Sequence, residues 1–149
     1  PAAIPRLIDM GAPPFLMAST VNLVIAQRLV RRICTKCIIS YSIPDGIKTM
    51  INDQISQAHL TGNVEIPQTL FKGNGCNICG KSGYTGQTAI FELLQVTEDI
   101  RRLILSRASN DDIRVQATKD GMISMLQDGL KKVEQGITTI EEVLRVTRE

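Results

Sequence analysis

The sequence contains no tryptophan and few other aromatic residues, three phenylalanines and two tyrosines, or 3% of 149 residues. A stacking platform for single-stranded nucleic acid needs repeated exposed rings, which this chain can hardly supply. The sequence also lacks a large excess of positive or negative residues, since it contains 17 Lys and Arg and 15 Asp and Glu. A net charge of +2 is too small to indicate nucleic-acid binding. We therefore expect no direct contact with nucleic acid.

Long apolar segments are absent as well. No run approaches the roughly 20 residues of a membrane-spanning helix, and no secretory signal opens the chain. The chain begins with proline rather than methionine, which indicates processing or excision from a longer protein. Because 43% of the residues are apolar and the length suffices for a sizeable core, we expect a soluble globular protein.

A phosphate-binding loop is a further absence. The pattern G-x-x-x-x-G-K-[ST], whose backbone cradles phosphates and whose hydroxyl binds Mg²⁺, does not occur in the sequence. The glycine-rich stretch at residues 73–80 surrounds two cysteines, and we interpret it as part of a metal site. We therefore expect this chain by itself neither to hydrolyse ATP nor to bind ATP and Mg²⁺ tightly.

Four cysteines in two C-x-x-C pairs carry the clearest chemical signal. The first pair is Cys34 and Cys37, the second is Cys76 and Cys79, and residues 38–75 separate them. Such a pair places two thiolates on one turn, at the separation that two ligands of a tetrahedral Zn²⁺ need. The alternatives are disulfides, which suit small secreted domains, and redox chemistry, which normally uses a single C-x-x-C. We predict a structural Zn²⁺ site, because four sulfur ligands leave no open coordination position.

Basic residues lie near both cysteine pairs, and Gly73, Gly75, Gly80 and Gly83 flank the second pair. Four thiolates around Zn²⁺ leave a net charge of about −2, and five basic residues near them in sequence are expected to offset it: Arg31, Arg32, Lys36, Lys72 and Lys81. The single histidine, His59, lies between the pairs on a predicted helix. We interpret it as solvent-exposed rather than as a fifth ligand.

Apolar periodicity and capping residues predict a mixed α/β order. Helices are predicted over residues 4–10 and 44–59, after the N-cap residues Thr97 and Ser109, over 122–135, and after a capping box formed by Thr138 with Glu141 or Thr139 with Glu142. Strands are predicted over 69–72 and 86–96. Residues 15–33 are ambiguous, because their arginine spacing favours a helix while their β-branched residues favour a strand.

Three separated blocks carry a resemblance to a known family. They read AIPRLIDMG at 3–11 with AQRLVRR at 26–32, then GYTGQTAIFE at 83–92, then DGLKK at 128–132 followed by GITTIEEVL at 136–144. In this order they closely resemble the C-terminal part of the type II secretion and type IV pilus assembly ATPases. One departure is Gln87, which stands where the family usually has arginine.

The resemblance implies a fold in four parts. It is the C-terminal edge of a RecA-like P-loop NTPase core over residues 1–33, a tetracysteine zinc-binding insert over 34–79, a returning edge strand over 80–96, and a small all-α domain over 97–149. The resemblance also implies a helix over 14–22 and a strand over 23–33. We expect loss of the metal to loosen the insert and to leave the helices after Thr97 largely folded.

The resemblance further implies a longer parent protein, a hexameric ATP hydrolase that uses ATP and Mg²⁺ to drive pilin or pseudopilin assembly. That protein is expected in the cytoplasm, peripheral at the bacterial inner membrane. Its implied partners are its own copies in a homohexamer, an inner-membrane platform protein and cytoplasmic domains of the machinery. Arg28 and Arg31 are candidates for contact with nucleotide or a neighbouring subunit, or form a solvated basic strand. The alternative function is a free-standing zinc-knuckle module that binds protein or nucleic acid.

Overall fold

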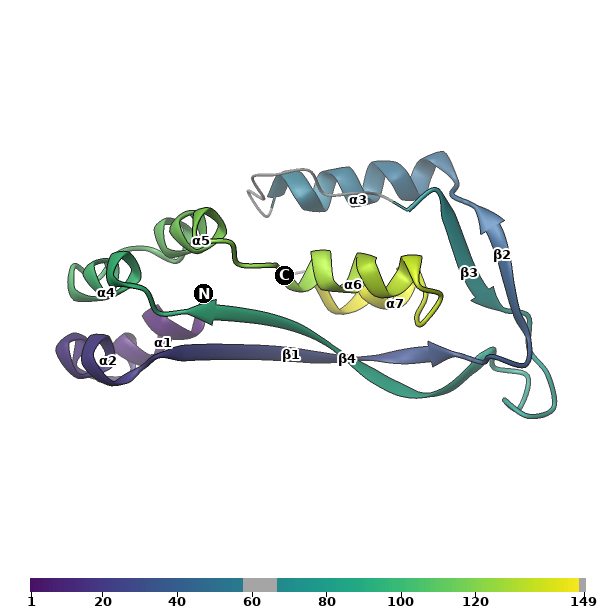
Figure 1. Cartoon of the computed structure of the whole chain (residues 1–149), viewed down its shortest axis with the longest axis horizontal. Coiled ribbons are helices and arrows are strands. Elements are labelled where there is room, and N and C mark those ends of the chain that lie inside the picture. Colours follow the sequence, from purple (N-terminus) through teal and green to yellow (C-terminus); the bar gives the residue numbers. More distant parts are fainter. Residues whose placement is uncertain (58–66, 148–149) are drawn as a thin grey trace. The chain divides into compact units, whose positions relative to one another are not determined.

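The residues that the computed structural model describes, 1–57 and 67–147, form seven helices and four strands (Figure 1). In chain order these are α1 (Ala3–Asp9), α2 (Pro14–Thr20), β1 (Leu23–Ile33), β2 (Ile38–Ser42), α3 (Asp45–Gln57), β3 (Thr69–Gly73), β4 (Tyr84–Gln95), α4 (Glu98–Leu105), α5 (Asn110–Lys119), α6 (Met125–Glu134) and α7 (Ile140–Thr147). The mixed α/β class is as predicted, whereas its relation to a RecA-like core stays a prediction. His59 lies outside the described residues.

Two two-stranded sheets pair β1 with β4 and β2 with β3. The N–H of Val96 donates to Asn22 O at one end of the first pair, and the N–H of Cys34 donates to Gly83 O at the other. These two bonds show that β1 and β4 run antiparallel, and we call this pair the β1–β4 ribbon. The ambiguous segment thus forms α2 followed by a strand, as the resemblance implied.

Strand β2 was not expected from the sequence. It is antiparallel to β3, with Ile38 opposite Gly73 and Ser42 opposite Thr69. A five-residue strand between a cysteine pair and Pro44 has no periodicity long enough to identify it. Although α3 separates the two strands in the sequence, β2 pairs with β3, and this pairing provides the backbone partners that keep β2 extended.

The chain divides into two compact units, each made of two separate stretches of sequence. Unit 1 comprises Pro1–Ala26 and Glu92–Ser124, and unit 2 comprises Gln27–Phe91 and Met125–Glu149. Helices α4 and α5 therefore belong to unit 1, whereas α6 and α7 belong to unit 2. The four-part division implied by the resemblance stays a prediction.

Unit 1 combines apolar helix faces with well-capped helices. The hydroxyl of Thr97 accepts from the N–H of Ile100 at 3.4 Å and so caps α4. Ser109 and Asp112 form a reciprocal capping box at the start of α5. Both N-caps were predicted. The buried core of the unit consists of Ile4, Met17, Ala18, Leu94, Val96, Ile100, Ile104, Ile113 and Ala117.

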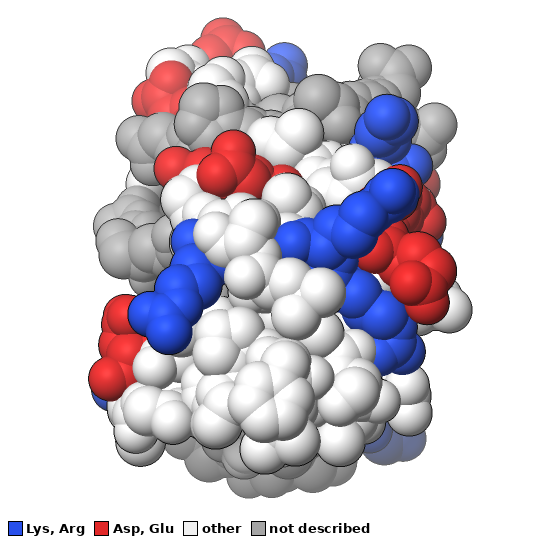
Figure 2. All heavy atoms as spheres, turned by 90° about the vertical axis from the view of Figure 1, so that its left-hand side faces the viewer, with Lys and Arg blue, Asp and Glu red and all other residues white. Residues whose placement is uncertain are grey.

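One apolar face of unit 1 is open to solvent. Met10, after α1, is 77% exposed and Phe15, on α2, is 63% exposed, and Leu7 and Leu16 lie beside them in sequence and are also exposed. Figure 2 shows this end of the molecule, with an uncharged area below a band of Lys and Arg side chains. Within residues 1–57 and 67–147, no helix has the length and apolar character needed to cross a membrane.

Unit 2 packs the segment between the cysteine pairs against the last two helices. Its buried core consists of Ile43, Ile51, Leu70, Leu126, Leu130, Val133, Ile140, Val143 and Leu144. These residues come from α3, β3, α6 and α7 and from the turn before α3. The expectation that the helices after Thr97 stay folded without the metal therefore stays a prediction for α4 and α5, whereas the shared core leads us to expect α6 and α7 to loosen with the insert.

Candidate metal centre

The four cysteine sulfurs form one cluster, in which all Sγ atoms lie within 4.8 Å of one another. The Sγ–Sγ separations are 3.8 Å for Cys34 and Cys76, 3.9 Å for Cys37 and Cys79, and 3.7 Å for Cys76 and Cys79. A tetrahedron of sulfurs about 2.3 Å from a central Zn²⁺ has edges of about 3.8 Å. The four cysteines could therefore hold a metal ion, and their geometry fits Zn²⁺.

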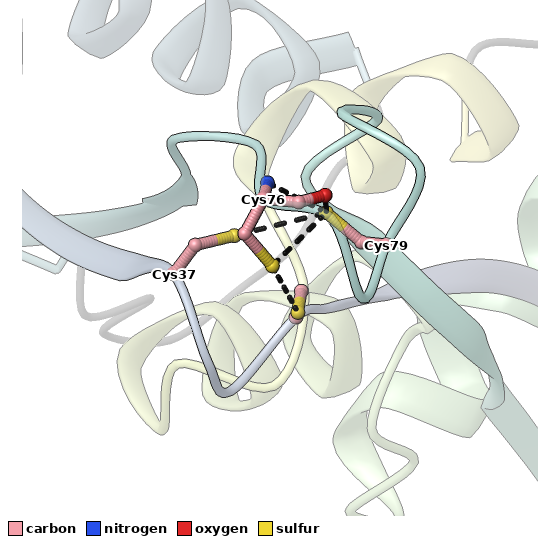
Figure 3. A group of neighbouring side chains, drawn as sticks. Cys37, Cys76 and Cys79 are labelled. Carbon is pink, nitrogen blue, oxygen red and sulfur yellow. Dashed lines mark hydrogen bonds between the residues drawn. The ribbon is translucent and has the colours of Figure 1, made fainter.

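The sulfur–sulfur distances are too long for the alternative interpretation, in which the cysteines form disulfides. A disulfide requires sulfurs about 2.05 Å apart, and all four cysteines are free thiols in this structure. Figure 3 shows that the side chains of Cys37, Cys76 and Cys79 point toward one another, although Cys37 comes from one turn of the chain and Cys76 and Cys79 from another. Convergence of four free thiols from two turns is typical of a structural tetracysteine site.

Both sheets end at this cluster, and their pairing brings the two cysteine pairs together. The first pair lies between β1 and β2, and the second lies between β3 and β4. Beyond the last rung of β2 and β3, the N–H of Asn74 donates to Cys37 O at 2.9 Å. Beyond the ribbon, the N–H of Cys34 donates to Gly83 O at the same distance. Strand register, rather than the loop sequence alone, therefore places the thiols.

A close backbone approach between Gly73 and Gly83 packs the second pair against β3. A Cβ atom added at Gly73 would lie only 2.0 Å from Gly83 O, and one added at Gly83 would lie 2.6 Å from Gly73 O. Gly83 also has a φ of +79°, which L side chains rarely adopt. A side chain at either position would collide with the backbone of the other residue, so the close approach itself requires glycine at both positions.

Backbone hydrogen bonds and burial shift the cysteine pKa values in opposite directions. The N–H groups of Cys76 and Gly83 donate to Cys79 Sγ at 3.1 and 3.3 Å, and they lower the pKa of Cys79 to about 6 against the effect of burial. A backbone hydrogen bond from Lys36 likewise lowers the pKa of Cys34. At Cys37, burial dominates and raises the pKa to about 11. Binding of a metal by all four thiolates must therefore release protons.

Two of the basic residues expected to offset the thiolate charge have other partners. The guanidinium of Arg31 donates to Glu142 at 2.8 Å and stacks over the Tyr84 ring, 4.1 Å from its centroid. The ammonium of Lys72 lies 5.2 Å from the ring centroid of Tyr41. Arg28, the other candidate for nucleotide contact, is exposed on β1. Contact of Arg28 or Arg31 with nucleotide stays a prediction.

Glu142 is a residue whose role sequence reasoning missed. It was expected only as part of a capping box, and its N–H indeed donates to Thr139 Oγ1 at 3.4 Å. Its side chain, however, is buried and bound to Arg31 and to Arg145. Burial by itself raises the pKa of Glu142, but the hydrogen bonds from Arg145 and Arg31 outweigh it and lower the pKa to about 2. No local sequence signal reveals a pair whose members lie 111 positions apart.

Comparison with known proteins places this arrangement in a family. Residues 1–145 match the family model described as type II/IV secretion system protein. The type II secretion system protein HxcR of Pseudomonas aeruginosa is 38% identical over 148 residues, which are 99% of this chain and 26% of that protein. The type IV pilus assembly ATPase PilB of Thermus thermophilus is 42% identical over 147 residues, which are 99% of this chain and 16% of that protein.

A third relative is the type II secretion system protein E of Pseudomonas aeruginosa, 41% identical over 147 residues. The match covers 99% of this chain and 27% of that protein. The chain therefore spans between 16% and 27% of the length of these relatives. Since the family model covers all but the last four positions, the chain belongs to the type II/IV secretion system protein family.

Proposed function

We propose that this chain is the C-terminal part of a longer motor ATPase that drives pilin or pseudopilin assembly in type IV pilus biogenesis or type II secretion. One observation carries the proposal: nearly the whole chain aligns with proteins named as assembly or secretion ATPases, and it spans about a quarter or less of each. The sequence has no phosphate loop of its own. The phosphate-binding part of the motor then lies elsewhere in the parent protein.

In this proposal the four cysteines hold one structural Zn²⁺. The sulfur separations support Zn²⁺, and the four-sulfur donor set leaves no position for a reacting water. The metal joins the turn after β1 to the turn before β4. Its role is to hold together the ends of strands that the chain separates by the whole insert.

Two exposed features of the chain support its attachment to a larger RecA-like core. The β1–β4 ribbon has only two strands among the described residues, so one edge of β1 lacks a neighbouring strand over most of its length. Apolar side chains of α1 and α2 are also open to solvent, notably Met10 and Phe15. Unpaired strand edges and exposed apolar faces are rarely left uncovered in a complete protein.

For the nucleotide or a neighbouring subunit, Arg28 is the better placed of the two candidate arginines. Its side chain is exposed, whereas Arg31 is already bound to Glu142. Contact between Arg31 and a phosphate would first have to break that ion pair. We therefore assign Arg31 to the structure of unit 2 and leave Arg28 as the candidate for contact with nucleotide or subunit.

The proposed setting follows from the same family relation. The parent protein works as a homohexamer in the cytoplasm, peripheral at the inner membrane, with a platform protein and cytoplasmic domains of the machinery as partners. It uses ATP and Mg²⁺, and no direct contact with nucleic acid is proposed. A free-standing zinc module is not favoured, because residues 34–79 are only one part of the family match.

The encoding gene tests the proposal. Its reading frame should continue upstream through a phosphate loop, and the protein made from the extended frame should hydrolyse ATP. The 149-residue chain, purified in the same way, should show no turnover above a contaminant control. A frame without a phosphate loop, or turnover on the order of 1 s⁻¹ by the short chain, would contradict the proposal.

A further inference from the structure

Helices α6 and α7 and the segment between them bind both edges of the β1–β4 ribbon, at Arg31 and Ile33 next to the cysteine cluster and at Phe91 farther along β4. Five residues make these contacts, and we call them the ribbon clamp: Asp128, Ile137, Thr138, Thr139 and Glu142. All five belong to unit 2, as do the four cysteines. The contacts involve mainly backbone groups of the strands, so they fix where each strand runs.

On the edge of β1, three successive backbone groups are bound by the clamp. The N–H of Arg31 donates to Glu142 Oε2 at 2.9 Å, and Arg31 O accepts from Thr138 Oγ1 at 2.8 Å. The N–H of Ile33 donates to Ile137 O at 2.9 Å. Cys34, the first cysteine of the cluster, follows immediately. The clamp therefore holds β1 up to the residue before a proposed metal ligand.

On β4, the clamp binds in two places. The N–H of Phe91 donates to Asp128 Oδ2 at 2.8 Å. The hydroxyl of Tyr84 lies 3.1 Å from Thr139 Oγ1. Tyr84 follows Gly83, whose N–H donates to Cys79 Sγ. Restraint of Tyr84 thus restrains a backbone donor to a second cysteine of the cluster.

Glu142 is the central residue of the clamp. Each of its carboxylate oxygens accepts from both Arg31 and Arg145. It is also the only buried charged side chain among the described residues. A buried carboxylate is tolerated only with such partners, and it fixes their geometry because removal of one partner is costly.

We propose that Glu142 is a positioning residue for the metal centre, which acts through the backbone of Arg31 to hold Cys34 in place. This inference rests on the proposed metal site. Because the clamp consists of one residue of α6, one of α7 and three of the segment between them, docking of these helices and binding of the metal favour each other. Thermodynamic linkage requires the effect to be reciprocal: the clamp tightens metal binding, and the metal stabilises the docked helices.

The test measures zinc affinity of the 149-residue chain by competition with a chromophoric chelator. Glu142→Gln should weaken zinc binding about tenfold, as is typical for loss of an outer-shell partner of a metal ligand. The matched control is Glu141→Gln, next in sequence and exposed, which should bind zinc as the unaltered chain does. Ile104→Ala, in the core of unit 1 on α4, controls for a general loss of stability and should leave zinc affinity unchanged.

A second readout separates positioning from general destabilisation. In the unaltered chain, addition of zinc should slow amide hydrogen exchange in α7 and in β3. In Glu142→Gln, zinc should still slow exchange in β3 but no longer in α7. Tyr84→Phe removes only the contact with Thr139, and it should weaken zinc binding two- to threefold even if Glu142→Gln fails to fold.

The outcomes distinguish this inference from the proposed metal site. Equal zinc affinity in Glu142→Gln, Tyr84→Phe and the unaltered chain, with α7 still responding to zinc, would overturn the positioning role and leave the metal site standing. Equal weakening by Ile104→Ala and Glu142→Gln would also overturn it. Failure of every chain to bind zinc or Co²⁺ would overturn both.

Discussion

Units 1 and 2 of this chain differ in size, since unit 2 is the larger, and they are stabilised in different ways. Unit 1 relies on an apolar core and on helices that carry their own caps, Thr97 and Ser109. Unit 2 has an apolar core as well, but it also contains four clustered thiols and the buried Glu142. We infer that unit 1 is stable without help, and that unit 2 depends on a metal and on charge.

The division into units does not follow the order of the helices along the chain. Helices α4 to α7 follow one another in sequence, yet two of them complete unit 1 and two complete unit 2. What separates them is their buried partners: α4 and α5 pack with α2, whereas α6 and α7 share a core with α3 and β3. Both tyrosines, Tyr41 and Tyr84, lie in unit 2. Tyrosine fluorescence therefore reports on the folding of unit 2 and not on that of unit 1.

Removal of the metal is the strongest way to separate the two units. A structural Zn²⁺ site supplies on the order of 10 kcal/mol of binding free energy. With a chelator, unit 2 should lose amide protection in β2, β3, α6 and α7 and should change its tyrosine fluorescence, while α4 and α5 stay protected. Cys76→Ser should behave like the chelated chain, and Ser40→Ala, at an exposed position of β2, should not. Equal loss of protection in α4 and α5 would show one cooperative unit instead.

A cavity in unit 1 is the converse experiment. Ile104 is fully buried on α4, so Ile104→Ala should cost about 2–5 kcal/mol. Hydrogen exchange of α4 and α5 should report this loss, whereas zinc affinity and the tyrosine unfolding midpoint should not change. The control is Leu105→Ala at the next, exposed position, which should cost less than about 0.5 kcal/mol. A fall in zinc affinity of the Ile104 variant would mean that the units are coupled.

The charge of Glu142 should make unit 2 the more acid-sensitive unit. The pKa of Glu142 is about 2 in the folded protein against an ordinary value of 4.5. Its ionised form therefore favours folding above about pH 4.5, and this contribution, on the order of 3 kcal/mol, disappears as the pH falls toward 2. Acid also releases zinc from the protonated thiols of both chains, so the measured quantity is the difference between the unaltered chain and Glu142→Gln at each pH. In urea titrations with excess zinc, this stability gap should narrow below pH 4.5. A gap independent of pH would exclude charge as its origin.

The smallest expected effect comes from the contact between α6 and α7. A Cβ atom at Gly129 would lie 2.4 Å from Val143 Cγ1, so Gly129→Ala should destabilise unit 2 by about 1–3 kcal/mol. Gly46, on α3 in the same unit, has open space around it. Gly46→Ala should therefore be neutral or stabilising by up to about 1 kcal/mol. Tyrosine fluorescence in urea compares the two, and a neutral Gly129→Ala would show that α6 and α7 can move apart at little cost.

Local signals in the sequence predicted much of the fold. Thr97 and Ser109 cap helices where expected, because a cap depends on neighbours only a few residues away. Helix α6 starts at Met125 instead of the predicted residue 122, directly after Ser124, a residue type that favours the N-cap position. Strand β2 was missed because its partner β3 lies beyond α3, and only that pairing makes a short apolar run a strand.

In the candidate site, too, the features with a local sequence pattern could be predicted and those that depend on distant contacts could not. The spacing of Cys34 and Cys37 with Cys76 and Cys79 predicted the cluster, because two ligands on one turn are a local pattern. The contact of Gly73 with Gly83 and the pair of Arg31 with Glu142 were not predictable, since each depends on register or on packing between distant segments. The sequence thus identified the four clustered thiols, but not the glycine contact and the ion pair that lie beside them.

The order in which the two units occur along the chain has a consequence for synthesis. Both cysteine pairs leave the ribosome before α6 and α7 do, because unit 2 is interrupted by Glu92–Ser124 of unit 1. At about 5–20 residues per second, the thiols are exposed for several seconds before Glu142 emerges. During that interval unit 1 can already fold, whereas the proposed zinc site must rely on its cysteines alone. Capture of zinc in the cell should then be completed only when the last helices arrive.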